Sequence, residues 1–457
     1  MDASSHFRGK RITIMGLGLL GRGVGDTRYL AECDAELIVT DLKTREQLTE
    51  SVAQLKSFKN ITFVLGEHRL EDFRNRDFIL KAAGVPLDSS YIAEAKKNGI
   101  PVRMSADLFA EISNIHCIGI TGTRGKSTVA HMIYEILKQA GKPVFLGGNV
   151  RGVSTLALLK EVTPEHIAVL ELDSWQLQGW GEVKMSPHIA VFTTIYPDHL
   201  NYYGSISLDK ARDKSLTTGK NAMDAYLADK ANIFLYQKTE DILILGKQCS
   251  ATIIEKYGDK IKSKISIIDE LKLPDTWSLC IPGLHNRYDA ALALGAARAF
   301  EIPDEISRHA LELFAGVPGR LELIAEKNGV KIYNDTTATT PEATNVAITA
   351  LSDVGPPRSH IILIMGGADK GLDMNALLVR LVEVKRTILL AGTGTSRVLA
   401  FIPNASVFDN LAQAVHEAFT SAEPGDIILF SPAFASFGMF KNEYDRGDQF
   451  TAIVQSL

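Results

Sequence analysis

The sequence has little of what marks a secreted, membrane-bound or nucleic-acid-binding protein. Only four of its 457 residues are cysteines, and they show no C-x-x-C or Cys/His spacing that would indicate a disulfide framework or a zinc site. No apolar run reaches the roughly 18 residues of a membrane span, and residues 1–10 form no apolar signal segment. The net charge of −5 leaves no basic footprint for nucleic acid or an anionic membrane. We therefore expect a cytoplasmic protein that binds neither nucleic acid nor a membrane.

What the chain does have is length and an ordinary globular composition. Its 457 residues suffice for about three domains, and 46% hydrophobic with 23% charged residues is typical of globular proteins. Apolar strands alternate with helical stretches, which predicts an α/β fold with parallel sheets. We expect a Rossmann-like domain over residues 1–112, a central P-loop domain over 113–316 and a Rossmann-like domain over 317–457.

A phosphate-binding loop follows an apolar strand at the start of the second domain. Residues 121–128 read T-G-T-R-G-K-S-T. Gly122 and Gly125 let backbone N–H groups approach a triphosphate, and Lys126 supplies an ammonium. A hydroxyl for Mg²⁺ comes from Ser127 or Thr128. The strict Walker pattern requires glycine where this chain has isoleucine at position 120, so the loop is a variant that still predicts ATP binding.

A second glycine loop lies near the start of the chain. The β-branched strand 11–15 is followed by G-L-G-L-L-G, with Gly16, Gly18 and Gly21 at the spacing of a dinucleotide-binding turn. A second strand ends at Asp41, about 20 residues further on. This layout predicts a Rossmann-like half that binds a nucleotide diphosphate.

Acidic, imidazole and small polar residues follow several other predicted strands. Glu171 follows the strand 167–170, and His199 lies shortly after the strand 189–194, so both are candidates for holding a metal. In the third domain, small or polar loops follow four strands at residues 334–337, 366–370, 392–394 and 431–433. Because such loops share one edge of a parallel sheet, they predict a binding face.

Several further motifs accompany the phosphate loop. They are G-G-N at 147–149, E-L-D-S-W-Q at 171–176, D-H at 198–199, G-L-H-N at 283–286 and G-R-L-E at 319–322. In these motifs and their order the chain resembles the Mur ligase family over nearly its whole length. The tail S-P-A-x-A-S-x-x-x-F-K-N at 431–442 is similar to that of the family members that add glutamate.

The resemblance implies a cytoplasmic step of peptidoglycan synthesis. ATP would phosphorylate the carboxylate of UDP-N-acetylmuramoyl-L-alanine, and the amine of D-glutamate would attack the resulting acyl phosphate. The implied partners are these two substrates and ATP, with Mg²⁺ at two sites and a carbamylated lysine as a metal ligand. We expect the protein to act as a monomer.

The resemblance also implies roles for individual residues. Catalysis would depend on Lys126, Glu171, His199 and Lys230. ATP would be bound by Gly122, Thr123, Gly125, Lys126, Ser127, Thr128, Asn286, Arg320 and Asp335. The UDP substrate would contact Gly16, Gly18, Gly21, Asp41, Asn149 and Ser174. Glutamate would contact Thr339, Lys370 and Ser436. The Mg²⁺ ligands would be Ser127 or Thr128, Glu171, His199 and Lys230 as its carbamate.

Two departures from the family pattern leave alternatives open. Spacing from His199 favours Lys214 as the carbamylated residue, whereas the pattern of residues 226–234 favours Lys230 and makes residues 206–222 an insertion; we prefer Lys230. Residues 335–339 read D-T-T-A-T where the family commonly has D-S-K-A-T, so Thr337 replaces an ammonium. The amino acid added is therefore open between D-glutamate, L-glutamate and another amino acid.

Rival functions fit fewer of the motifs. A folylpolyglutamate synthase shares the T-G-T-x-G-K-[ST] loop but has no need of the first glycine loop. A nicotinamide-dependent oxidoreductase would leave Lys126 and Glu171 without a purpose, and a mechanical P-loop ATPase would have the strict Walker spacing.

Overall fold

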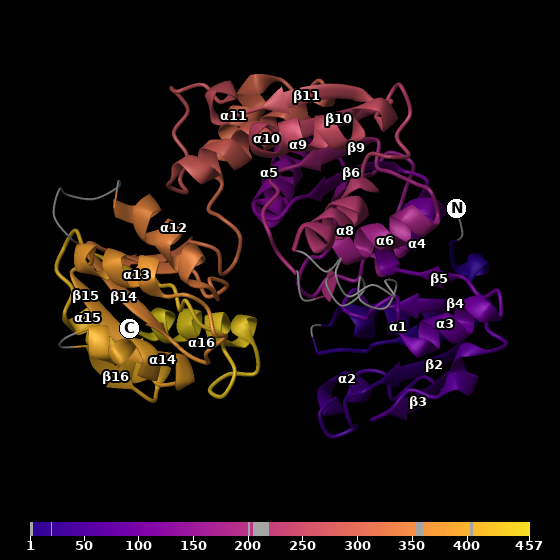
Figure 1. Ribbon diagram of the computed structural model, residues 1–457, viewed down its shortest axis with the longest axis horizontal. Helices are drawn as coiled ribbons and strands as arrows, with labels where there is room; N and C mark the ends of the chain where they lie inside the picture. Colours follow the sequence, from indigo (N-terminus) through magenta and orange to yellow (C-terminus); the bar gives the residue numbers. More distant parts are fainter. Residues whose placement is uncertain (1–2, 20, 200–201, 204–218, 353–359, 403–404) are drawn as a thin grey trace. The chain divides into compact units, whose positions relative to one another are not determined.

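The computed structural model describes residues 3–19, 21–199, 202–203, 219–352, 360–402 and 405–457 (Figure 1). Lys214 and most of the expected insertion at 206–222 lie outside the described residues. The chain forms two compact units. One comprises Met1–Leu273 with Asp289–Ala310, and the other comprises Pro274–Tyr288 with Leu311–Leu457.

The first sheet lies in the first unit and has five parallel strands in the order β3-β2-β1-β4-β5. The strands are β1 (Arg11–Met15), β2 (Glu36–Asp41), β3 (Ile61–Leu65), β4 (Phe78–Lys81) and β5 (Val102–Arg103). The accompanying helices are α1 (Arg22–Glu32), α2 (Thr49–Ala53), α3 (Ser90–Lys97) and α4 (Ser105–Ser113). This strand order is that of a Rossmann half, which confirms the predicted fold of the N-terminal part.

The second sheet of this unit has six parallel strands in the order β11-β10-β9-β6-β8-β7. The strands are β6 (His116–Thr121), β7 (Val144–Gly148), β8 (Ile167–Glu171), β9 (Ile189–Phe192), β10 (Ile242–Gly246) and β11 (Lys264–Ile268). The helices are α5 (Lys126–Gln139), α6 (Ser174–Glu182), α8 (Gly219–Ala231) and α9 (Lys247–Tyr257). Two further helices, α10 (Leu284–Ala299) and α11 (Asp304–Leu313), have most of their residues in this unit and the rest in the other. Because β6 lies between β9 and β8, the loops after these three strands meet at one edge.

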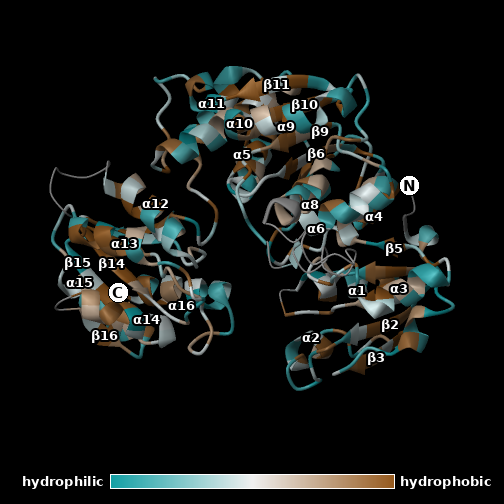
Figure 2. Ribbon diagram, viewed as in Figure 1, coloured by the Kyte–Doolittle hydropathy of each residue, from teal (hydrophilic) through white to brown (hydrophobic). Residues whose placement is uncertain are grey.

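The inner strands are mostly apolar, as parallel strands covered on both faces are (Figure 2). Every residue of β8 and of β9 is buried. The edge strand β11 differs, because Ile265 and Ile267 remain partly exposed there. Burial of the inner strands fixes the positions of the polar groups that follow them.

The third sheet lies in the second unit and has the order β12-β13-β17-β14-β15-β16, with only β12 antiparallel to its neighbour. The strands are β12 (Glu322–Lys327), β13 (Val330–Asn334), β14 (Ile361–Gly366), β15 (Arg386–Leu390), β16 (Ser406–Phe408) and β17 (Ile427–Phe430). The helices are α12 (Pro341–Ser352), α13 (Asn375–Arg380), α14 (Thr393–Val398), α15 (Leu411–Thr420) and α16 (Glu443–Ser456).

Alternate residues of β17 point to two different cores. Ile427 and Leu429 pack with residues of α12, α13 and α14. Ile428 and Phe430 pack with residues of α15 and α16. Helices therefore cover both faces of the third sheet, as the sequence predicts for a doubly wound domain. Within the described residues, no helix combines the length and hydropathy needed to cross a membrane.

Candidate active site

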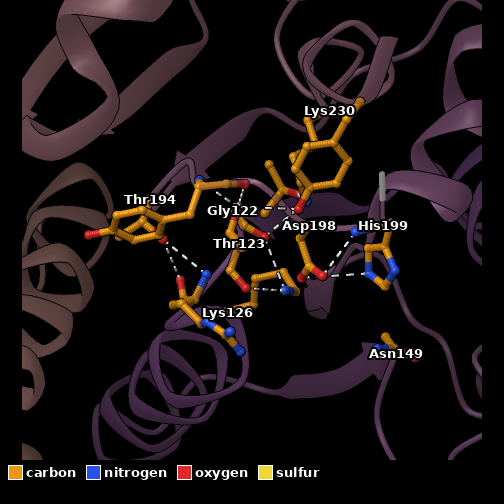
Figure 3. Close-up of polar contacts among 12 residues, drawn as sticks. Gly122, Thr123, Lys126, Asn149, Thr194, Asp198, His199 and Lys230 are labelled. Carbon is orange, nitrogen blue, oxygen red and sulfur yellow. Dashed lines mark hydrogen bonds and ion pairs between the residues drawn. The ribbon is translucent and has the colours of Figure 1, made fainter. Parts of the chain in front are cut away.

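The phosphate loop connects β6 to α5 (Figure 3). Gly122 and Gly125 have φ values of 143° and 84°, which favour glycine. A Cβ atom on Gly122 would lie 2.0 Å from the Thr193 hydroxyl oxygen, and one on Gly125 would lie 2.4 Å from a carboxylate oxygen of Asp289. The backbone conformation therefore favours glycine at both positions, and at Gly122 the close packing of the loop requires it as well.

The end of β9 anchors the same loop. The backbone N–H of Thr123 donates to the Thr194 carbonyl at 2.7 Å, and the backbone N–H of Arg124 donates to the Thr194 hydroxyl at 2.9 Å. The Thr123 hydroxyl lies 3.2 Å from the hydroxyl of Tyr226 on α8. These contacts hold the loop between two elements that are distant in sequence.

Lys126 is the first residue of α5, and its ammonium folds back over the loop. It donates to the carbonyl oxygens of Gly122 at 3.0 Å and Thr123 at 3.1 Å. Ser127 is buried and Thr128 half-buried in the same helical turn. A cation, two hydroxyls and a helix N-terminus thus gather at one place, which suits a polyphosphate.

Lys230 reaches the phosphate loop from α8 and is 1% exposed. Its Nζ donates to the Gly122 carbonyl at 2.9 Å and to the Thr121 hydroxyl at 3.2 Å, and lies 4.8 Å from the centre of the Tyr226 ring. Burial, reinforced by the Lys126 ammonium, holds the pKa of Lys230 well below its usual value of 10.5. The sequence motif proposed this lysine, but only the structure shows that it is buried.

Glu171 ends β8 and is buried beside Asn149. The Asn149 side-chain nitrogen donates to Oε1 of Glu171 at 3.4 Å, and the Asn149 backbone N–H donates to the Glu171 carbonyl at 2.7 Å. The side-chain oxygen of Asn149 accepts a hydrogen bond from the guanidinium of Arg22, on α1. The sequence analysis missed Arg22, although an arginine directly after the third glycine of the first loop was visible.

His199 lies next to Asp198 after β9 and has a left-handed backbone, with φ of 54°. Its Nε2 is 3.7 Å from a carboxylate oxygen of Asp198, and its ring centre is 4.7 Å from that of Trp175. Burial lowers the pKa of His199 below 6.5, so the neutral imidazole predominates at pH 7. A neutral imidazole can serve as a metal ligand.

Among the residues that the structure describes, no group of three or more His, Cys, Asp or Glu side chains is arranged to hold a metal ion. Glu171 and His199 therefore do not belong to such a preformed cluster. A metal site here would need ligands of other kinds, such as hydroxyl or phosphate oxygens.

The first glycine loop follows β1. Gly16, Gly18 and Gly21 all have positive φ values, and Gly21 precedes the first residue of α1. The carboxylate of Asp41 accepts from the backbone N–H of Gly18 at 3.0 Å, so it holds the loop in place. Ser174, the remaining residue expected to contact the UDP substrate, is buried at the start of α6.

The expected nucleotide residues Asn286, Arg320 and Asp335 belong to the second unit. Asp335 is buried and accepts from the Ser431 hydroxyl at 2.7 Å and from the Leu321 backbone N–H at 3.0 Å. Burial raises the pKa of Asp335 to about 7. Arg320 is exposed, and the side chain of Asn286 is buried and donates to the Pro282 carbonyl at 2.6 Å.

The three expected glutamate residues lie on loops that follow β13, β14 and β17. The Lys370 ammonium donates to the Thr339 hydroxyl at 2.9 Å, which brings two of these loops together. Ser436 is buried beside Ala435, whose backbone N–H donates to the Ala368 carbonyl at 3.1 Å. The predicted binding face of the third domain is thus formed by loops in mutual contact.

Arg446, on α16, joins two of these loops and was not predicted. Its guanidinium is fully buried and donates to the Thr336 carbonyl at 2.7 Å, the Thr336 hydroxyl at 3.1 Å and the Phe434 carbonyl at 3.1 Å. Burial lowers the pKa of Arg446 to about 10. No sequence signal marks this residue, because its partners are more than a hundred positions away or belong to the backbone.

The fold and the phosphate loop define a modular α/β protein that binds ATP through its central domain. Family models agree along the chain. Residues 10–104 match the Mur ligase MurD-like N-terminal domain, residues 120–272 the Mur ligase middle domain, and residues 319–434 the Mur ligase glutamate ligase domain. The chain belongs to the Mur ligase family.

Within that family, curated relatives named UDP-N-acetylmuramoylalanine–D-glutamate ligase match the chain from end to end. The protein from Roseiflexus sp. (strain RS-1) is 36% identical over 98% of this chain and 99% of its own length. The protein from Borreliella burgdorferi (strain ATCC 35210) is 34% identical over 97% of each chain. That from Geobacillus kaustophilus (strain HTA426) is 32% identical over the full length of both.

Solved structures share the fold at lower identity. UDP-N-acetylmuramate–alanine ligase MurC from Thermotoga maritima has a TM-score of 0.62 and 15% identity, covering 98% of this chain and 99% of its own. MurF ligase from the same organism, in complex with ADP, has a TM-score of 0.53 and 18% identity, covering 80% and 91%.

Proposed function

We propose that this protein is an ATP-dependent ligase that joins D-glutamate to UDP-N-acetylmuramoyl-L-alanine. The observation that carries the proposal is that one unit holds two ligand loops, the glycine loop after β1 and the phosphate loop 121–128. Asn149 links Arg22, which follows the glycine loop, to Glu171, at the end of the strand that pairs with β6. A UDP substrate and ATP are the two ligands that such loops bind. The curated relatives, matched along their whole length, are named for this activity.

The reaction proceeds in two displacements. A carboxylate oxygen of the alanyl group attacks the γ-phosphorus of ATP, the bond to the β-phosphate oxygen breaks, and ADP leaves. The amine nitrogen of glutamate then attacks the carbonyl carbon, a proton leaves the nitrogen, and phosphate departs as the amide forms. Such steps require charge neutralisation and positioning more than a nucleophilic side chain.

Lys126 neutralises charge on the transferred phosphoryl group. Its ammonium donates hydrogen bonds to the carbonyl oxygens of Gly122 and Thr123. Phosphate oxygens are stronger hydrogen-bond acceptors than these carbonyl oxygens, because they are charged. The N-terminus of α5 adds partial positive charge at the same place. These groups stabilise the charge that develops as the phosphoryl group moves.

The donor groups near the loop suit Mg²⁺, which prefers oxygen ligands. The hydroxyl of Ser127 or Thr128 and the carboxylate of Glu171 would hold one ion, and His199 would ligate a second. When bound, the ions neutralise phosphate charge and orient the phosphoryl group. As a carbamate, Lys230 would be a further ligand of the second ion. The lowered pKa of Lys230 favours its neutral amine, which can bond to carbon dioxide with loss of a proton.

The remaining ligand contacts follow the loops. Residues 1–112 take the UDP substrate, which contacts Gly16, Gly18, Gly21, Asp41, Asn149 and Ser174. Residues 113–316 take ATP, with Asn286 at the nucleotide, joined by Arg320 and Asp335 from residues 317–457. The latter residues also take glutamate, which contacts Thr339, Lys370 and Ser436. We propose further that the protein acts as a monomer in the cytoplasm.

Thr337 is compatible with a glutamate site. Its hydroxyl donates to the Gly319 carbonyl at 2.9 Å, so the side chain stabilises the loop. The ammonium missing at this position leaves Lys370 to attract the carboxylates of glutamate. The charge at the site is therefore reduced and not abolished.

Phosphate release from MgATP and UDP-N-acetylmuramoyl-L-alanine tests the proposal. D-glutamate, L-glutamate and no amino acid are compared at equal enzyme concentration. Release that requires D-glutamate is the expected result. Phosphate release with L-glutamate but not with D-glutamate would show that L-glutamate is the amino acid added. Phosphate release without any amino acid would overturn the proposed ligase activity.

A further inference from the structure

One face of helix α1 packs against the segment that follows β7. Gly25 permits the approach, because a Cβ atom there would lie 2.5 Å from the Cβ of Ser154. The next residue of α1 is Asp26. Its carboxylate accepts hydrogen bonds from the Ser154 hydroxyl at 2.6 Å and from the Ser105 hydroxyl at 2.9 Å. The helix that completes the first glycine loop is thereby fixed against the segment that carries Asn149.

Arg22 extends this contact toward Glu171. Its guanidinium donates to the side-chain oxygen of Asn149, whose side-chain nitrogen donates to Glu171. A guanidinium can only donate hydrogen bonds and a carboxylate can only accept them. Both neighbours therefore select the same orientation of the Asn149 amide, and the reverse orientation would set oxygen against oxygen at Glu171.

The position of Arg22 in the first turn of α1 is electrostatically unfavourable unless an anion lies near it. A cation in the first turn of a helix is repelled by the partial positive charge of the helix N-terminus. Asp26, one turn along α1, offsets part of this charge. A nucleotide diphosphate at the N-terminus of α1 would supply more, since this is where the glycine loop delivers such a ligand.

We infer that Arg22 is a positioning residue of the ligase reaction. It holds the Asn149 amide in the orientation that places its nitrogen at Glu171, and so links the UDP-sugar loop to the place where the substrate carboxylate is phosphorylated. The inference rests on the proposed function and adds to it a residue that acts through Asn149.

A double-mutant cycle tests the inference on the full-length enzyme. The variants are Arg22→Leu, Arg22→Lys, Asn149→Ala and the double variant Arg22→Leu/Asn149→Ala. Lys160→Ala is the matched control, because Lys160 pairs with Glu32 at the other end of α1 without touching Asn149. The readouts are kcat, the KM for ATP, and the Kd of UDP-N-acetylmuramoyl-L-alanine from calorimetry.

Arg22→Leu is expected to lower kcat about tenfold with the KM for ATP unchanged, because a misplaced group reduces the rate more than ATP binding. Arg22→Lys recovers part of the loss, since an ammonium still donates one hydrogen bond. In the Asn149→Ala background, Arg22→Leu costs less than about twofold, since coupled residues are not additive. Lys160→Ala keeps wild-type values.

Other outcomes overturn the inference. Additive losses in kcat or in Kd would show that Arg22 acts on the substrate directly or through the fold, and an equal loss in Lys160→Ala would show a general effect of the helix contact. A wild-type enzyme that binds the UDP substrate without turnover would refute the proposed function alone, and the cycle in Kd would still decide the role of Arg22. A wild-type enzyme that neither binds nor reacts would refute both.

Discussion

The ammonium nitrogens of Lys126 and Lys230 donate to the same acceptor, the carbonyl oxygen of Gly122, at 3.0 and 2.9 Å. Two like charges that share one acceptor repel each other, and Lys230 is the more deeply buried of the two. Its pKa is therefore lowered. Lys126 is therefore suited to bind phosphate as a cation, and Lys230 is suited to carbamylation as a neutral amine.

Replacing Lys126 by methionine removes the ammonium and keeps the apolar stem. Amide formation is expected to fall by a factor on the order of 10²–10³, the usual loss when one charge-stabilising donor is removed. Glutamate-dependent phosphate release measures it. Lys142→Met, an exposed lysine just beyond α5, is the control and should change nothing. A Lys126→Met enzyme that keeps half of its activity would contradict the assigned role.

Lys230→Met is expected to abolish activity and to raise thermal stability. The pKa of Lys230 is lower in the folded than in the unfolded protein, so wild-type stability rises with pH between that lowered pKa and 10.5. The advantage of methionine is therefore largest on the acid side of this window and disappears above it. Thermal melts at several pH values in carbon-dioxide-free buffer measure the difference. A variant that melts below wild type at neutral pH would refute the expectation.

Gly122→Ala is expected to destabilise the protein and to abolish ATP binding. The new Cβ atom would lie 2.0 Å from the Thr193 hydroxyl oxygen, at a φ of 143° that alanine disfavours. Gly258→Ala is the matched control, because its Cβ atom would meet only Ile254, at an ordinary 3.7 Å. Calorimetric binding of ATP and thermal melts distinguish the two. Equal behaviour of the two variants would show that the loop tolerates a side chain.

Asp335→Asn is expected to stabilise the second unit at alkaline pH. The pKa of Asp335 is about 7 in the folded protein and 3.8 in the unfolded chain, so the folded protein binds the extra proton between these values. Wild-type stability therefore falls as pH rises from 3.8 to 7, and asparagine avoids the loss. Above pH 7 the melting temperature should rise by several degrees relative to wild type, and near pH 4 the difference should vanish. A constant difference across the pH range would contradict the assignment.

Strands inside a sheet could be predicted from the sequence more readily than the short strands at its edges. The bounds of the inner strand β1 agree with prediction to the residue. The short edge strands β5 and β16 span two and three residues, which is too little for a period to show. Strand β7 ends in two glycines, and β12 pairs antiparallel at an edge where only part of each side chain is buried. Burial produces the apolar runs that prediction depends on, and edges lack it.

The site could be predicted where one local motif carries the chemistry. The phosphate loop indicated Lys126, which is the first residue of α5 and directly follows Gly125. Contacts formed by folding left no sequence signal. Arg22 and Asn149 are 127 positions apart in the sequence. The hydrogen bond from Lys230 to Gly122 forms only because α8 packs against the loop after β6.

Arg446 has a consequence for how this enzyme can vary in evolution. Two of its three hydrogen bonds go to backbone carbonyls, those of Thr336 and Phe434, so they survive most changes of side chain. A loop anchored through backbone carbonyls keeps these anchors when its other side chains are exchanged. Substrate preference could then drift one residue at a time while the architecture of the third domain stays the same.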